Sequence, residues 1–71
     1  MIGSFEECRR AFLPFAEVEL AVAKEFCVEI HFKYEVSDEQ IEVIEKAVRH
    51  RTTNMMWVDR RLVVVTYPPL P

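Results

Sequence analysis

Three residues with metal-binding side chains share one side of a predicted strand. Cys27, Glu29 and His31 stand two residues apart in the segment FCVEIHFKYEV, which alternates apolar and polar residues throughout. Residues at this spacing point to the same face of a β-strand, and thiolate, carboxylate and imidazole groups all bind zinc. However, Cys27 and His31 are about 13 Å apart along a flat strand, so one ion reaches both only with help from another element. The pattern therefore predicts an exposed polar strand face and no metal site.

Four arginines form the second candidate site. If the end of a predicted helix and the tip of a predicted hairpin lie at the same end of the sheet, their positive charges would bind phosphate or nucleic acid. The residues concerned are Arg49, Arg51, Arg60 and Arg61. The simpler interpretation is that positive charge complements the helix C-terminus and that the turn is solvated. A small nucleic-acid-binding protein is therefore the alternative function.

Catalytic arrangements are not visible in the sequence. A chain with one glycine, Gly3, cannot form a glycine-rich phosphate loop. The two serines, Ser4 and Ser37, both precede predicted helices, where serine caps the N-terminus. Paired acidic residues fall in first helical turns, where they complement the helix dipole. The sequence thus predicts no enzymatic activity and no cofactor.

Composition indicates one small globular domain that extends over residues 1–71. Of the 71 residues, 51% are hydrophobic and 30% charged, which is a globular composition. Residues 1–47 hold 5 basic and 11 acidic side chains, while residues 48–71 hold 4 and 1. Such asymmetry favours self-association or an acidic partner over general nucleic-acid binding. The scarcity of Gly, Asn and Gln is typical of thermostable proteins.

The predicted location is the cytoplasm. No run of 18 apolar residues is long enough to cross a membrane. The start, MIGSFEECRR, has no basic segment ahead of an apolar one, as a secretory signal would. In a reducing compartment Cys8 and Cys27 are expected as free thiols, with a disulfide between them as the open alternative.

Two helices are predicted from their capping residues. Ser4 with Glu7 forms a capping box ahead of a helix over residues 5–13. Ser37 with Gln40 repeats the pattern ahead of a second helix. The buried stripe of the second helix is predicted as Ile41, Ile44, Ala47 and Val48.

The stretch between the first helix and the long strand has two interpretations. Phe15, Val18 and Val22 repeat at helical spacing, whereas Val18, Leu20 and Val22 alternate as in a strand. Three alanines and the lack of Gly, Asn or Pro before Phe26 favour a helix over residues 15–25. The strand remains the alternative.

The remaining segments predict strands. Residues 26–36 form one long strand, and residues 55–67 form a hairpin that turns at residues 59–61. The order is therefore α-α(or β)-β-α-β-β. The predicted fold class is α+β: a small antiparallel sheet of three to four strands with two or three helices.

The hairpin is apolar on both faces, although one sheet face must also carry the charged side of residues 26–36. The surplus apolar side chains are predicted to form an interface with a partner protein: Met55, Trp57, Val63, Val65 and Tyr67. Part of the long strand is also expected to offer free backbone groups to a partner strand. The alternative is that the N-terminal segment covers this area.

Taken with the charge asymmetry, the apolar hairpin predicts a non-catalytic protein–protein association module. Its possible forms are a homodimer, a small subunit of an assembly, or a compact protein inhibitor such as those of viruses and mobile elements. The proline-rich C-terminal tail, residues 68–71, has the composition of a polyproline II segment. Proline there is interpreted as a block to further strand pairing.

Overall fold

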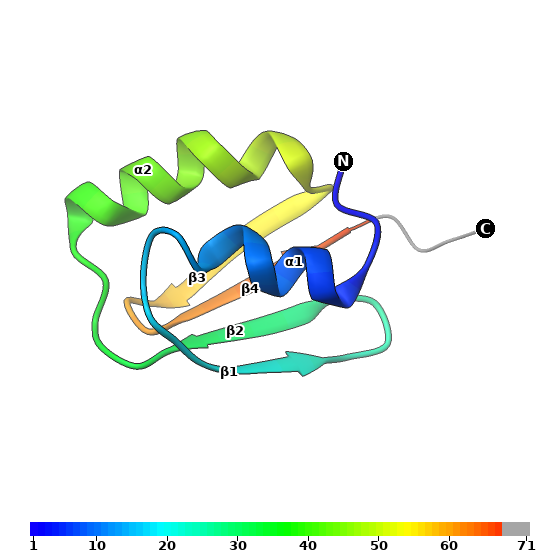
Figure 1. The fold of residues 1–71 in the computed structure, drawn as a ribbon, viewed down its shortest axis with the longest axis horizontal. Coiled ribbons are helices and arrows are strands. Elements are labelled where there is room, and N and C mark those ends of the chain that lie inside the picture. Colours follow the sequence, from blue (N-terminus) through cyan, green and yellow to red (C-terminus); the bar gives the residue numbers. More distant parts are fainter. Residues whose placement is uncertain (68–71) are drawn as a thin grey trace.

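The computed structural model describes residues 1–67, which contain two α-helices, one short 3-10 helix and four strands (Figure 1). In chain order they are α1 (Phe5–Phe12), β1 (Val18–Ala23), β2 (Val28–Phe32), α2 (Asp38–Val48), η1 (Arg49–Arg51), β3 (Asn54–Asp59) and β4 (Leu62–Thr66). The predicted α+β class, with an antiparallel sheet of three to four strands and two or three helices, is therefore confirmed, and the sheet has four strands. The proline-rich tail at residues 68–71 lies outside the described residues.

The sheet joins two hairpins in the order β1-β2-β4-β3, with every neighbouring pair antiparallel. β2 is only five residues long and lies between β1 and β4. The prediction of one strand over residues 26–36 with free backbone groups is therefore wrong. The segment after β2 is held by its own chain, because the Lys33 N–H donates to Glu17 O and the Val36 N–H donates to Arg60 O.

For residues 15–25 the favoured helix is wrong and the alternative strand is confirmed, since this segment contains β1. The turn into β2 closes through a hydrogen bond from Lys24 N–H to Cys27 O of 2.8 Å. Within the described residues no backbone has a positive φ, so this turn needs no Gly or Asn. The missing turn signal was therefore not evidence against a hairpin.

Both helices begin where their capping residues predict. The Ser4 hydroxyl accepts from Glu7 N–H and the Ser37 hydroxyl accepts from Gln40 N–H, each at 3.2 Å. The Gln40 side chain donates to Phe15 O at 2.9 Å, which ties α2 to the loop after α1. Capping of this kind satisfies backbone donors that a helix leaves unpaired at its first turn.

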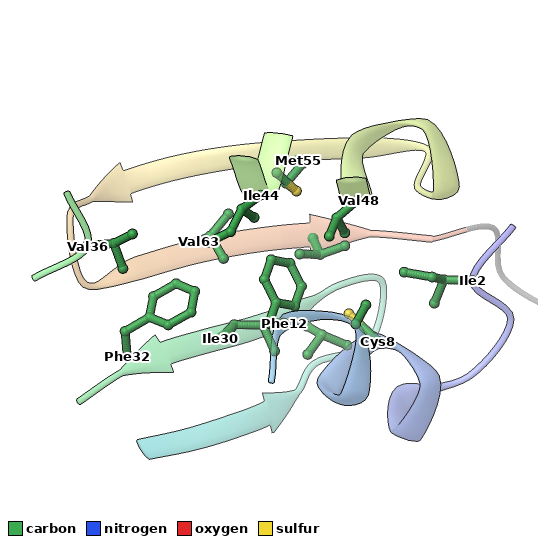
Figure 2. Close-up of a cluster of buried hydrophobic side chains, with 13 residues drawn as sticks. Ile2, Cys8, Phe12, Ile30, Phe32, Val36, Ile44, Val48, Met55 and Val63 are labelled. Carbon is green, nitrogen blue, oxygen red and sulfur yellow. The ribbon is translucent and has the colours of Figure 1, made fainter. Parts of the chain in front are cut away.

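The hydrophobic core lies between the two helices and one face of the sheet (Figure 2). Ile44 and Val48 of α2 and Ile30 and Phe32 of β2 are all buried there, as the helical and strand periodicities predict. α1 contributes Cys8 and Phe12, and the Phe12 ring meets the Phe32 ring edge-on at 6.1 Å. Both cysteines are free thiols, so the alternative of a disulfide is not realised.

Candidate protein interface on the open face of the sheet

The sheet face that turns away from the helices is apolar over most of its width. In β4 the buried Val63 and Val65 alternate with Leu62 and Val64, which are only partly buried. Because side chains alternate along a strand, Leu62 and Val64 lie on this second face. The residues that lie level with Leu62 and Val64 on β1 and β3 extend this surface across the sheet.

Six apolar side chains make up what is called here the open apolar face. They are Leu20, Val22, Met56, Val58, Leu62 and Val64. Leu20 is 54% exposed, and Met56 and Val58 are each 56% exposed. Residues from β1, β3 and β4 thus gather on one side of the molecule, with nothing in the described chain covering them. Contiguous exposed apolar surface of this kind is typical of an interaction site.

A polar pair crosses this apolar surface along β2. Glu29 and His31 lie between the apolar residues of β1 and those of β4. The His31 Nε2 and Glu29 Oε1 atoms are 3.1 Å apart, and the two side chains are 34% and 30% exposed. The polar face predicted for this strand therefore exists, but its two central groups bond to each other and are half-buried among apolar neighbours.

The side chains predicted as the interface lie in or against the core instead. Met55 is 2% exposed, and Val63 and Val65 are fully buried. Trp57 stacks on the Phe32 ring at a centroid distance of 5.7 Å, and Tyr67 also packs against the core. The prediction therefore chose the wrong side of the hairpin: the side with Met56 and Val58 is the exposed one.

The reason is the register of β2 against β4. Ile30 pairs with Val63 and Val28 with Val65, so the apolar side of β2 and this side of the hairpin share one face. A register shifted by one residue would have reversed the assignment. The helices cover that shared face, which leaves the open apolar face as the surplus surface.

The predicted arginine cluster does not form. Arg60 is ion-paired with Asp38, at the start of α2, with 2.6 Å between Nη2 and Oδ1. Arg49 and Arg51 follow the last residue of α2. An 11-residue helix is about 16 Å long, so these two arginines lie about that far from Asp38. Figure 1 shows the β3–β4 turn and η1 at opposite ends of α2.

Three of these arginines are also occupied by contacts within the chain. Arg60 donates to Val36 O at 3.3 Å and Arg61 donates to Lys33 O at 3.2 Å. Arg49 donates to the Glu45 carboxylate and, at 2.6 Å, to Met55 O. These bonds tie the hairpin tip to the segment after β2 and tie α2 to the β3 edge. The four side chains therefore do not converge on a shared phosphate site.

The two outer strands are irregular. The β1–β2 register shifts between Val18 and Leu20, and the β3–β4 register shifts between Trp57 and Asp59. Bulges of this kind bend an edge strand and discourage pairing with another chain. On β3 the Arg49 side chain also occupies the Met55 carbonyl. The two edges are therefore poorly suited to pairing with a strand of another chain.

Other candidate chemistry has little geometric support. Among residues 1–67, no group of three His, Cys, Asp or Glu side chains is placed to hold a metal ion, so Cys27, Glu29 and His31 do not combine with a further ligand. Burial raises the pKa of the Cys8 thiol to about 11, which keeps it protonated near neutral pH. A depression of about 280 Å³ near the loop after α1 is lined by Ala16, Glu17, Tyr34, Glu35, Val36 and Gln40.

Comparison of the chain with family models, with curated proteins and with solved structures finds no match in any of the three. Within the described residues, neither helix has the length and apolar character needed to cross a membrane.

Proposed function

We propose that this chain is a non-catalytic association module that binds another protein surface through the open apolar face. The observation that carries the proposal is the exposure of Leu20, Met56 and Val58, each more than half accessible, on a sheet face that no part of residues 1–67 covers. Burial of such side chains contributes a favourable term of about 25 cal/mol per Å² of apolar surface removed from water, which must exceed the entropic cost of association.

The cost of leaving this surface in water supports the same proposal. A chain of 71 residues buries only about 60–65% of its unfolded surface and has a small core. It nevertheless places six large apolar side chains on the face opposite that core. A partner that covers them would add to the stability of the fold while forming the complex.

Site-specific photo-crosslinking in the protein's own cells tests this proposal. A benzoylphenylalanine placed at Met56 reports on the open apolar face, and the same group at Val43 is the matched control. Val43 is 50% exposed on α2, and Met56 is 56% exposed. The two positions therefore differ in face and hardly in accessibility.

Discrete adducts from position 56 that are absent from position 43 are the expected result, whether the captured protein is a second copy or a different chain. Adducts of equal yield from both positions, or none from position 56, would contradict the proposal. Far-UV circular dichroism of both variants verifies that each is folded before crosslinking.

A further inference from the structure

We propose that the partner of the open apolar face is a second copy of this chain, packed sheet against sheet about a two-fold axis that crosses β2 between Glu29 and His31. This inference rests on the function proposed above and identifies the partner. It follows from the pattern of side chains on the face, from the hydrogen-bonding capacity of the polar pair, and from the state of the sheet edges.

The face is built of two rows that run across the strands. One row is Val22–Glu29–Val64–Met56, and the next is Leu20–His31–Leu62–Asp59, with Val58 in the bulge beside Asp59. Over β1, β2 and β4 the two rows repeat the same order: apolar, polar, apolar. Exchanging the rows therefore leaves the pattern of apolar and polar columns unchanged over these three strands.

A two-fold axis in the interface, perpendicular to β2, performs this exchange. It places the apolar columns of β1 and β4 against the same columns of the second copy, which runs antiparallel. It also places Glu29 of each copy opposite His31 of the other. The two sheet planes would be about 10 Å apart, and the side chains of both copies fill the space between them. A two-fold axis parallel to the strands would instead place Glu29 opposite Glu29 of the second copy if it ran over β2, where like charges repel, or opposite Val64 if it ran midway between β2 and β4. Burying a carboxylate against apolar groups is costly, so the perpendicular axis is favoured.

The polar pair distinguishes a second copy from an apolar partner. Within residues 1–67 the only side-chain hydrogen bond of Glu29 and His31 is the one between them. The second carboxylate oxygen and the second ring nitrogen therefore depend on water. Covering the face removes that water, and buried polar atoms require new partners. Because the Glu29 carboxylate only accepts, Nε2 of His31 is the donor within the pair, and Nδ1 donates as well when the ring is an imidazolium. In that form His31 of each copy donates to Glu29 of the other, and each contact is made twice by symmetry.

The edges of the sheet are less suited to contact with a second copy than the open apolar face is. Both edge strands carry a register irregularity, and Arg49 occupies the Met55 carbonyl on the β3 edge. If an edge strand paired with the edge strand of a second copy, the irregular registers would have to straighten and the hydrogen bond from Arg49 to Met55 O would have to break. Packing face to face leaves them undisturbed.

The small area of the open apolar face indicates a low affinity between the two copies. Four strands about 4.8 Å apart and five residues long have a projected area of about 320 Å², which is a small footprint for an interface when a standard one buries roughly 800 Å² of accessible surface per partner. We therefore expect a weak dimer with a dissociation constant of about 10–100 μM.

The first measurement is sedimentation equilibrium of the wild-type chain from about 5 μM to about 1 mM, spanning the expected dissociation constant. The mass should rise from monomer to dimer. Val58→Lys should weaken the dimer at least about tenfold by burying a charge, and Val43→Lys, at a similarly exposed valine on α2, should leave it unchanged. A wild-type mass that stays monomeric throughout, or equal effects of the two lysines, would overturn the inference.

The second measurement tests the axis through a pair of charge variants. His31→Glu presents two carboxylates and Glu29→Lys presents two basic groups, so neither variant should self-associate. Mixed in equal amounts, they should form a heterodimer in which each carboxylate faces a basic group of the other chain. Recovery of the dimer to within about tenfold of wild type supports reciprocal pairing across the two-fold. Monomers in the mixture, with both variants folded by circular dichroism, would refute it.

The two proposals fail differently. If position 56 crosslinks to other proteins while the chain remains monomeric at about 1 mM, the second-copy inference is wrong and the association function stands. If position 56 yields no specific adduct, the association function is wrong, and this inference with it.

Discussion

Two adjacent methionines offer a test of which side of the β3–β4 hairpin forms the core. Met55 is 2% exposed and Met56 is 56% exposed, although they are neighbours in the same strand. Alanine at either position removes the same atoms and changes strand propensity equally. Any difference in the free energy of unfolding therefore reports the environment of the side chain.

At Met55 the substitution removes a fully buried side chain and leaves a cavity between α2 and the sheet. Such changes cost about 2–4 kcal/mol, which combines lost transfer free energy with the cavity. At Met56 less than half of the side chain is covered, and solvent fills the space, so the expected cost is below about 1 kcal/mol. In a domain with a total stability of about 4–10 kcal/mol, the difference is large.

The assay is urea denaturation followed by far-UV circular dichroism at about 5 μM, below the expected dissociation constant of the proposed dimer. Met55→Ala should lower the urea midpoint, and in a thermal melt of the same sample it should lower the melting temperature by about 10 °C or more, since 1 kcal/mol corresponds to about 4–8 °C in a domain of this size. Val63→Ala and Val64→Ala repeat the comparison on β4, where Val63 should be the costly position. Equal losses within either pair, or a larger loss at Met56 or Val64, would refute the assignment of faces.

Four further predictions concern single side chains. Because Cys8 is buried and its pKa is raised from 9.0 to about 11, a thiol reagent at pH 8 should modify the more accessible Cys27 rapidly and Cys8 only on unfolding. The same shift means that the folded state binds the Cys8 proton more tightly between pH 9 and 11, so stability should fall across that range, and less so in Cys8→Ala. Ser37→Ala should cost about 1 kcal/mol in urea denaturation through loss of the α2 N-cap. The hydrogen bond from Arg49 lowers the pKa of Glu45 below 4.5. Arg49→Ala should therefore be more destabilising in thermal melts at pH 7 than at pH 3, because the ionised carboxylate is lost as the pH falls through the lowered pKa.

The local structure was predictable wherever a residue acts on its immediate neighbours. Ser4 and Ser37 cap the two helices because a serine hydroxyl reaches the N–H group three residues ahead in any context. The buried stripe of Ile44 and Val48 followed from helical periodicity, and the α+β class followed from the alternation of such segments.

The segment now known as β1 was not predictable in this way. Its alanines have helical propensity, but the strand pairs with β2 along most of its length, and those hydrogen bonds override so weak a preference. The turn between Lys24 and Cys27 uses ordinary backbone conformations, so it requires no Gly, Asn or Pro that would identify it in the sequence.

The hairpin has more apolar surface than one core can use, and this is visible in the sequence because Leu62 to Val65 are apolar on both sides of a strand. Which side is buried depends on how the strands pair and where the helices pack. The pairing of Ile30 with Val63 depends on register, and a shift of one residue turns every side chain to the opposite face. Within the hairpin both faces are apolar, so the packing of α1 and α2 onto one of them makes the other the candidate interface.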